Sequence, residues 1–346
     1  MLDPTKFYPW QINIASKWLQ NRNRFSHAWL IHGLPGIGKQ QFALAAAASI
    51  LCEQPSKELA CGRCQSCHWI KHGNHPDIKR IRPDSHALSE YEEGYPVDDS
   101  TLGGAKSISN EIRVDQLRRL ESWFNTATHK GGYRVAVLYP AQNLNIISAN
   151  ALLKILEEPP TSTLFFLVAD AVDMLLPTIV SRCRRMPLPV PDTDVGIQWL
   201  KENNIKKPEL WLSATSMAPV KALKLALEAS QPYPDWLPKL LKLVVISDTN
   251  PDVSGLISEI EKDKGTICIE IIQRALIDTL LLKNGLPARY YPDLEVLHDL
   301  MNRVSSKSVS NTLKWIGKQK LIANHPVNYS LLLHSMLQRL ILTLRS

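Results

Sequence analysis

The chain has 346 residues, of which 45% are hydrophobic, and a formal net charge of +7. This length is enough for two or three domains, each with its own hydrophobic core. The positive charge allows an anionic partner such as nucleic acid without requiring one. No apolar run approaches the roughly 18–20 residues of a membrane-spanning helix, and residues 1–6 lack the layout of a secretory signal. We therefore expect a cytoplasmic protein without a membrane partner.

The first predicted elements are a helix and a strand–loop–helix. Apolar residues recur at helical spacing over 10–19. An apolar strand at 28–31 leads into Gly-Leu-Pro-Gly-Ile-Gly-Lys-Gln at 33–40, and an alanine-rich helix follows. In such a loop the glycines turn backbone N–H groups toward a phosphate, and the lysine reaches its outer oxygens. A plain Gly/Pro turn is the alternative. The predicted phosphate-binding residues are Gly33, Gly36, Gly38 and Lys39.

Three positions argue against ATP hydrolysis at this loop. Gln40 follows the lysine, where a Ser or Thr hydroxyl would hold Mg²⁺. A buried strand is predicted at 133–139, and Tyr139 and Pro140 stand at its end, where an ATPase needs acidic residues to hold Mg²⁺ and polarise water. A phenol and an imide can do neither. We therefore expect that ATP is not hydrolysed here and is not bound productively.

Four of the six cysteines lie close together in the sequence. Their spacing lets four thiolates converge on one ion, with Gly62 easing the turn, and such a set suits structural zinc. Disulfides are disfavoured in a reducing cytosol. One of His68, His72 and His75 is the alternative ligand. A closed site of this kind supports a fold and leaves no position for catalysis. The predicted zinc ligands are Cys52, Cys61, Cys64 and Cys67.

The middle of the chain alternates between irregular and regular segments. Residues 84–110 are rich in Ser, Gly, Asp and Glu, which predicts a long exposed loop. A helix is expected to start near Asp115. After the strand at 133–139, the pattern predicts a helix over 144–157, a strand over 164–169 and a helix that leads to Ser181.

Two motifs carry a family resemblance: Asn-Ala-Leu-Leu-Lys-Ile-Leu-Glu-Glu-Pro-Pro at 150–160 and Ser-Arg-Cys at 181–183. Together with the phosphate loop and the cysteine module, they make the chain resemble bacterial clamp-loader subunits of the AAA+ superfamily, of the gamma/tau or delta-prime type. The missing acids and Gln40 favour the delta-prime type of DNA polymerase III, which does not hydrolyse ATP. The resemblance is strong over residues 10–190 and weaker beyond them.

The resemblance implies a role for Arg182, which Ser181 and Cys183 flank in the motif. In the family, this arginine projects into the ATP site of the neighbouring subunit as an arginine finger. A guanidinium suits that task because it can stabilise charge on a γ-phosphate through paired hydrogen bonds. A surface ion pair is the alternative, and Arg184 and Arg185 are nearby candidates for the same role.

Two departures from the active family members weaken the case for nucleotide binding. Asp170 stands where those members carry a polar sensor, and its charge would repel a triphosphate. No arginine lies at 216–221, where the resemblance places a second sensor. Lys39 nevertheless leaves weak nucleotide binding open.

The remainder of the chain is expected to be helical. Prolines within 186–191 form a stiff linker, and helices are predicted at 236–246, 267–282, 294–304 and 331–344. The predicted architecture has three domains. They are an α/β AAA+ P-loop domain with a parallel sheet over 1–188, with its zinc module at 52–67, a small helical lid over 189–231, and an all-α collar over 232–346.

The resemblance implies a delta-prime subunit of the DNA polymerase III clamp loader, which acts in DNA replication. Such a subunit is an ATPase-silent stator within a DNA-directed DNA polymerase complex. The implied partners are the gamma/tau ATPase subunits and the delta subunit, with the sliding clamp and primer–template DNA reached indirectly. Two alternatives remain. The loop at 33–39 favours an active gamma/tau-type ATPase motor, and the basic charge favours a zinc-stabilised DNA-binding module, although the basic residues form no clear stripe.

Overall fold

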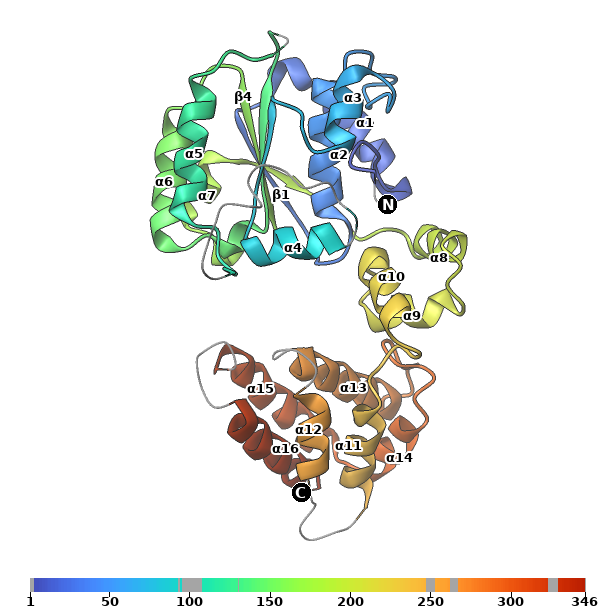
Figure 1. Cartoon of the computed structure of the whole chain (residues 1–346). Coiled ribbons are helices and arrows are strands. Elements are labelled where there is room, and N and C mark those ends of the chain that lie inside the picture. Colours follow the sequence, from blue (N-terminus) through green and yellow to red (C-terminus); the bar gives the residue numbers. More distant parts are fainter. Residues whose placement is uncertain are drawn as a thin grey trace. The chain divides into compact units, whose positions relative to one another are not determined.

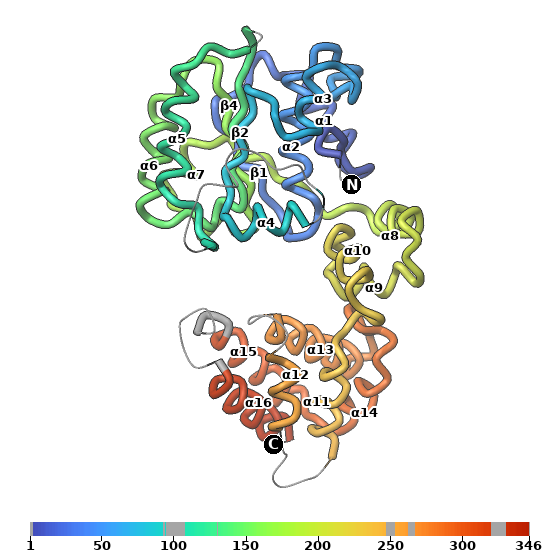
Figure 2. Tube along the Cα trace, in the orientation of Figure 1, coloured from blue at the N-terminus to red at the C-terminus, as the bar shows by residue number. Residues whose placement is uncertain are grey.

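The computed structural model describes residues 3–92, 94, 108–129, 131–246, 253–261, 267–322 and 329–345. The chain divides into two compact units, Met1–Gly196 and Ile197–Ser346. Figures 1 and 2 show the elements of both units, coloured along the chain. Within these described ranges, none of the helices has the length and apolar character needed to cross a membrane.

A five-stranded parallel sheet forms the centre of the first unit, with strand order β2-β3-β4-β1-β5. Its strands are β1 (Ala28–His32), β2 (Ile78–Ile81), β3 (Arg134–Leu138), β4 (Thr163–Ala169) and β5 (Arg184–Pro187). The register places Leu30 opposite Leu167 and Val137 opposite Phe166. Strands β3 and β4 are buried along their whole length, as continuous apolar runs favour in a parallel sheet. The predicted parallel α/β sheet and its three predicted strands are confirmed.

Helices cover both faces of this sheet (Figure 1). One face carries α1 (Ile12–Leu19), α2 (Lys39–Leu51) and α3 (Gln65–Lys71), and the other carries α5 (Val114–Phe124), α6 (Ile146–Glu157) and α7 (Pro177–Arg182). Because side chains alternate along a strand, β1 and β4 each supply both cores. On the first face the Trp18 ring lies 5.1 Å from that of Trp29 and 5.5 Å from that of Phe166. Leu30 and Leu167 belong to the core under α5, α6 and α7.

Short 3-10 turns join several of these elements. They are η1 (Pro9–Gln11), η2 (Arg22–Arg24), η3 (Ala141–Asn143) and η4 (Val172–Met174). Turns η3 and η4 begin three residues after the last residues of β3 and β4 and therefore lie at the edge of the sheet where the phosphate loop begins. This is the edge at which open parallel sheets bind ligands.

The loop predicted from residue 84 onward is wrong for its first part. Residues 84–92 form helix α4 (Asp84–Glu92), with the acidic Asp84 in its first turn, where a negative charge is favourable. The helix buries Ala87 and Glu90 against the rest of the unit. Composition alone did not reveal it because the stabilising contacts come from distant residues. Residue 93 and residues 95–107 of the predicted loop lie outside the described residues.

The linker predicted at 186–191 begins later than expected. Met186 and Pro187 are the last residues of β5 and lie opposite Ile31 and His32 of β1. A proline is tolerated there because β5 is an edge strand, which needs no donor on its outer side. The N–H of Leu188 continues the pairing, with a hydrogen bond of 2.8 Å to the carbonyl of His32.

The named elements within the described residues of the second unit are helices, and their apolar side chains form two hydrophobic clusters. Helix α8 (Thr193–Glu202), which begins in the first unit, packs with α9 (Pro208–Ala214) and α10 (Pro219–Glu228) around a small cluster that includes Trp211. A larger cluster joins α11 (Trp236–Val245), α12 (Ser254–Ile260), α13 (Ile267–Lys283), α14 (Val296–Arg303), α15 (Ser306–Ile322) and α16 (Tyr329–Arg345). The four helices predicted after residue 235 are confirmed, whereas the bounds of the three predicted domains stay a prediction.

Candidate functional sites: the phosphate loop, the cysteine cluster and Arg182

The glycine-rich segment forms the connection between β1 and α2 that its sequence predicts. Gly33 directly follows β1, and Gly36 and Gly38 have φ angles of 80° and 86°, a left-handed region that glycine adopts readily. A Cβ atom at Gly38 would lie 2.5 Å from the ring of Tyr8, so the close approach of that ring requires glycine. Lys39 is the first residue of α2, where the helix N-terminus adds partial positive charge.

The N-terminal segment, residues 3–11, contacts this loop through hydrogen bonds. The indole N–H of Trp10 donates to the carbonyl of Ile37 at 3.0 Å, and the amide of Gln11 donates to the carbonyl of Gly38 at 2.8 Å. The rings of Tyr8 and Trp10 stack with their centroids 4.8 Å apart. These contacts use carbonyl oxygens, so they fix the shape of the loop without consuming the N–H groups that would bind a phosphate.

Lys39 is engaged by groups of the chain itself. Its ammonium donates to the carbonyl of Leu34 at 2.6 Å and forms an ion pair with Asp170 Oδ1 at 2.5 Å. The Lys39 side chain is only 4% exposed, and this burial lowers the pKa of its ammonium, an effect that Asp170 opposes. The amide of Gln142 in turn donates to Asp170 Oδ2 at 3.3 Å and accepts the N–H of Asp170 at 3.2 Å. From the sequence, Asp170 was expected to repel a triphosphate. In the structure it also forms a direct ion pair with Lys39.

Gln40, which follows the loop lysine where a Ser or Thr hydroxyl would hold Mg²⁺, contacts a buried carboxylate. Its amide donates to Glu90 Oε1, and Glu90 Oε2 lies 2.6 Å from Arg82 Nε and 3.7 Å from a terminal nitrogen of Arg80. Tyr139 is fully buried beside this group, and desolvation, reinforced by the charge of Glu90, raises its pKa well above the usual value. We call these residues the Glu90 network. The network thus joins Gln40 and Tyr139, two of the positions at which the sequence lacks the residues that serve Mg²⁺ in an ATPase.

The Glu90 network carries a stability prediction. We expect Glu90→Ala to lower the free energy of unfolding by about 3–5 kcal/mol, because it removes the carboxylate shared by two buried arginines. Urea titrations followed by tryptophan fluorescence would measure the change. Glu92→Ala, on the exposed end of the same helix, is the matched control and should change stability by less than about 0.5 kcal/mol. Equal unfolding midpoints for the two variants would contradict the prediction.

The four predicted zinc ligands come together in the structure. Their Sγ atoms all lie within 4.8 Å of one another, and those of Cys52 and Cys64 are 3.8 Å apart. In a tetrahedral site with Zn–S bonds of about 2.3 Å, neighbouring sulfur atoms are about 3.8 Å apart, so the four thiols fit a structural zinc ion with little adjustment. All six cysteines of the chain are free thiols.

Backbone N–H groups stabilise thiolates within this cluster. The N–H of Cys61 points at Cys52 Sγ and that of Cys64 at Cys61 Sγ, both at 3.3 Å. The N–H of Arg63 is the main reason that the pKa of Cys61 falls to about 6. Burial raises the pKa of Cys52 and Cys67, so a bound cation would be needed to keep all four groups deprotonated.

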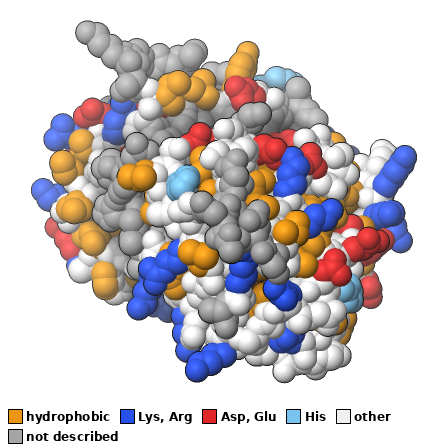
Figure 3. Space-filling model, turned by 90° about the horizontal axis from the view of Figure 1, so that it is seen from below, with side chains coloured by type: hydrophobic (Ala, Val, Ile, Leu, Met, Phe, Trp, Pro, Cys, Tyr) orange, Lys and Arg blue, Asp and Glu red, His pale blue; other side chains and the backbone are white. Residues whose placement is uncertain are grey.

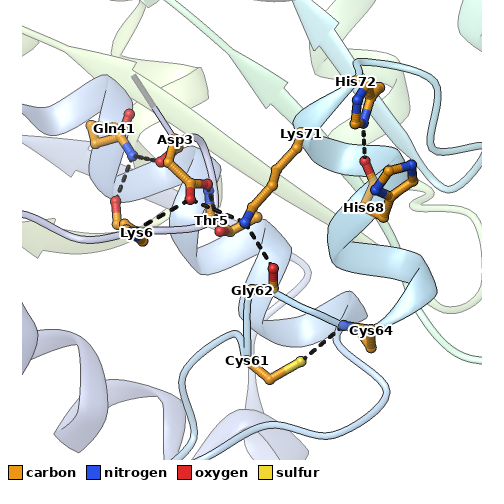
Figure 4. Close-up of polar contacts among 10 residues, drawn as sticks. All are labelled: Asp3, Thr5, Lys6, Gln41, Cys61, Gly62, Cys64, His68, Lys71 and His72. Atoms are coloured by element: carbon orange, nitrogen blue, oxygen red, sulfur yellow. Dashed lines mark hydrogen bonds and ion pairs between the residues drawn. The ribbon is translucent and has the colours of Figure 1, made fainter. Parts of the chain in front are cut away.

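The histidines considered as alternative ligands make other contacts. His75 is buried, with its Nε2 2.7 Å from the hydroxyl of Ser66 and its Nδ1 accepting the N–H of Asp77. His72 Nδ1 lies 2.8 Å from the carbonyl of His68, as Figure 4 shows. Within the described part of the chain, the clustered metal-binding side chains are the four cysteines.

Polar contacts connect the cysteine cluster to the helix that begins at the phosphate loop (Figure 4). Lys71 reaches from α3 to the carbonyl of Gly62 at 2.7 Å and to the carboxylate of Asp3 at 3.2 Å. The amide of Gln41, in the first turn of α2, donates to the carbonyl of Asp3 at 2.8 Å. The turn between the cysteines is thus tied through the N-terminal segment to the start of α2.

Arg182 ends helix α7, with its side chain 34% exposed. Its guanidinium donates to the carbonyl of Thr178 at 3.1 Å and pairs with Glu157 at the end of α6. Ser181 also hydrogen-bonds to Thr178, and Cys183 is buried, with its pKa raised to about 12 by desolvation. The surface ion pair considered from the sequence is therefore present, and the role of Arg182 toward a neighbour stays a prediction.

Sequence reasoning missed three members of the Glu90 network, Arg80, Arg82 and Glu90 itself. A signal was available, because Arg80 and Arg82 are two residues apart in an extended segment and so project to the same side. Buried arginines require an acidic partner. The partner was hidden in the segment that composition assigned to a loop. Arg184, an alternative to Arg182, places its guanidinium 5.2 Å from the centre of the Trp29 ring.

The first unit is thus a parallel α/β domain of the phosphate-loop class with a four-cysteine module. The chain belongs to the family described as "DNA polymerase III, delta subunit", whose model matches residues 12–192.

Curated relatives agree with this family. The chain is 36% identical over 193 residues to DNA polymerase III subunit delta' of Pseudomonas aeruginosa, a match that covers 56% of this chain and 52% of that protein. The subunit delta' of Yersinia pestis is 33% identical over 223 residues, covering 64% of this chain and 58% of that protein. The matches therefore span little more than half the length of these relatives.

Among solved structures, a DNA polymerase III gamma subunit-related protein of Thermotoga maritima aligns with 97% of this chain and 100% of its own. Its sequence identity is 16% and the TM-score is 0.44. This likeness is too distant to bear on function.

Proposed function

We propose that the chain is an ATPase-silent subunit of a DNA polymerase III clamp loader, of the delta-prime type. The observation that carries the proposal is the combination of the family match with a phosphate loop whose Lys39 and Gln40 are engaged by the chain's own Asp170 and Glu90. In this role the subunit is a rigid component of an assembly with gamma/tau and delta subunits. It contributes to placing the sliding clamp on primed DNA without turning over ATP itself.

The first unit then serves as the AAA+ domain of the subunit. Strand β1 lies between β4 and β5, so that its loop and the ends of β3 and β4 meet at one edge of the sheet. The helices α8, α9 and α10 correspond to the predicted lid, and the larger cluster of helices to the predicted collar. The collar would hold the subunit within the loader.

Arg182 is the group that this subunit offers to its neighbour. Its guanidinium and the Glu157 carboxylate are both partly exposed, at 34% and 49%. Ion pairs at such exposed positions contribute only about 0–1 kcal/mol, so Arg182 can exchange its partner for a phosphate at little cost. A guanidinium held at the end of a helix is suited to neutralise charge on the γ-phosphate of an ATP bound next door.

Zinc at the four cysteines would have a structural task. Four thiolates complete a tetrahedral zinc site, which leaves no open position for substrate. Because Lys71 and Asp3 connect the cysteine turn to the start of α2, the metal would hold the N-terminal segment against the phosphate loop.

The two alternative functions have less support. An active ATPase motor needs a free lysine and a metal seat at the loop, and here both positions contact acidic side chains of the chain. A DNA-binding module needs a continuous basic surface. On the face shown in Figure 3, the visible Lys and Arg side chains are scattered among acidic and hydrophobic ones.

Reconstitution with purified partner subunits tests the proposal. We expect no ATP turnover by the chain alone, and loss of clamp loading onto primed DNA when the chain is omitted from gamma/tau and delta subunits. ATP turnover is measured by phosphate release, and loading by retention of a labelled clamp on circular primed DNA. Turnover by the lone chain that Lys39→Ala abolishes would establish the motor alternative. Full clamp loading without the chain would overturn the proposal.

A further inference from the structure

The phosphate loop of this chain keeps the parts that bind a phosphate. Gly36 and Gly38 retain left-handed backbone angles, and Lys39 begins a helix of 13 residues. The contacts from Trp10 and Gln11 use carbonyl groups and leave the loop's N–H groups out of their hydrogen bonds. The backbone cradle has therefore been retained, while the side chains around it have changed.

The side chain of Asp170 stands where a phosphate oxygen would contact the lysine. An ammonium has three N–H donors. One donor of Lys39 contacts the Leu34 carbonyl and a second contacts Asp170 Oδ1, at 2.6 and 2.5 Å. Gln142 holds the other carboxylate oxygen and the backbone N–H of Asp170, so the carboxylate is fixed in position before any ligand arrives.

This arrangement opposes an incoming polyphosphate in two ways. Lys39 is almost fully buried, while Asp170 is 40% exposed, so their ion pair is screened less by water than a pair between two exposed side chains. A phosphate that reached Lys39 would also lie against the Asp170 carboxylate, and two negative charges at such a distance repel each other strongly.

We propose that Asp170 is an internal anion that locks the phosphate loop, and that removing this one carboxylate uncovers a binding site for the polyphosphate group of a nucleoside triphosphate. This inference rests on the proposed ATPase-silent role and gives a structural reason why the loop does not bind ATP productively. The lock is separate from the Glu90 network, which contacts Gln40 on the metal side of the loop. Removing the Asp170 carboxylate therefore restores binding of the nucleoside triphosphate without restoring its hydrolysis.

The test is a titration of the full chain with a fluorescent ATP analogue carrying a label on its ribose, with and without Mg²⁺. We expect Asp170→Asn to bind at least about tenfold more tightly than the wild-type chain, because a like charge next to the phosphates is removed. Asparagine has nearly the same shape and retains hydrogen bonding to Gln142. Asp173→Asn is the matched control, since it removes one negative charge from the exposed turn η4 and leaves the ion pair at Lys39 intact.

Two further variants make the result decisive. The double variant Asp170→Asn with Lys39→Ala should lose the gained affinity, which shows that the ligand occupies this loop. Asp170→Ser is measured as well, so that a folding defect of the asparagine variant, seen as a lower unfolding temperature, does not decide the outcome.

The possible outcomes separate the lock from the proposed function. If neither Asp170 variant binds the ATP analogue more tightly than Asp173→Asn does, the proposed lock is wrong. The proposed ATPase-silent role is not affected by that result. If the wild-type chain itself binds and hydrolyses ATP, both the proposed ATPase-silent function and the lock are contradicted. Tighter binding by an Asp170 variant without ATP turnover supports the lock.

Discussion

The Arg182→Ala variant is expected to lower ATP turnover at the neighbouring site of an assembled clamp loader by about 10³–10⁵-fold, the range measured for arginine fingers. The physical reason is that the guanidinium stabilises negative charge that develops on the transferred phosphoryl group. In the chain by itself the arginine is held at the end of α7 by Thr178 and Glu157. Turnover is measured with clamp and primed DNA present, and the intact assembly is checked by size-exclusion chromatography.

Two matched variants separate a finger from a general loss of charge. Arg182→Lys keeps the charge but lacks the planar fork that pairs with phosphate oxygens, so it should remain far below wild type. Arg185→Ala removes an exposed arginine from the following strand and should leave turnover nearly unchanged. Wild-type turnover in an intact Arg182→Ala assembly, or an equal loss in Arg185→Ala, would remove Arg182 from this role.

The Cys64→Ser variant is expected to lose bound zinc and to unfold at a temperature at least about 6 °C lower than wild type. That shift corresponds to about 3 kcal/mol for a unit of this size. Zinc-finger peptides gain more than this from their metal, but the first unit also has its own hydrophobic core. Cys64 is the informative position because its sulfur also caps helix α3 by accepting the N–H of Cys67. Serine preserves a cap of this kind, so the variant isolates the loss of the metal ligand.

Zinc content is measured by elemental mass spectrometry and unfolding by circular dichroism. The control is Arg63→Ser, an exposed residue of the same turn, which should keep about one zinc ion per chain and the wild-type unfolding temperature. A wild-type chain purified without metal that stays unchanged when zinc is added would contradict the zinc prediction. Equal unfolding temperatures for Cys64→Ser and wild type would show that the cluster has no structural task.

The features that could be predicted correctly are those encoded by neighbouring residues. The central strands were recognisable because a buried parallel strand is an uninterrupted apolar run, as in residues 134–138 and 164–169. The glycine loop and the four-cysteine cluster were recognisable by spacing alone. Helix α4 was missed because its stability depends on Glu90, whose partners Arg80 and Arg82 lie in β2 and directly after it. Strand β5 was missed because its four residues are mostly exposed and include a proline.

The sequence by itself determined that the chain has a phosphate loop without hydrolytic acids, a cluster of four thiols and helical C-terminal segments, because each depends on residue types at short spacing. Only the tertiary structure decided what these groups contact. Lys39 meets Asp170 because β1 and β4 are neighbours in the sheet, and their carboxyl ends bring the two residues to one edge. Strand order depends on packing among distant segments. That is why the sequence identified the lysine and the aspartate separately and only the fold joined them.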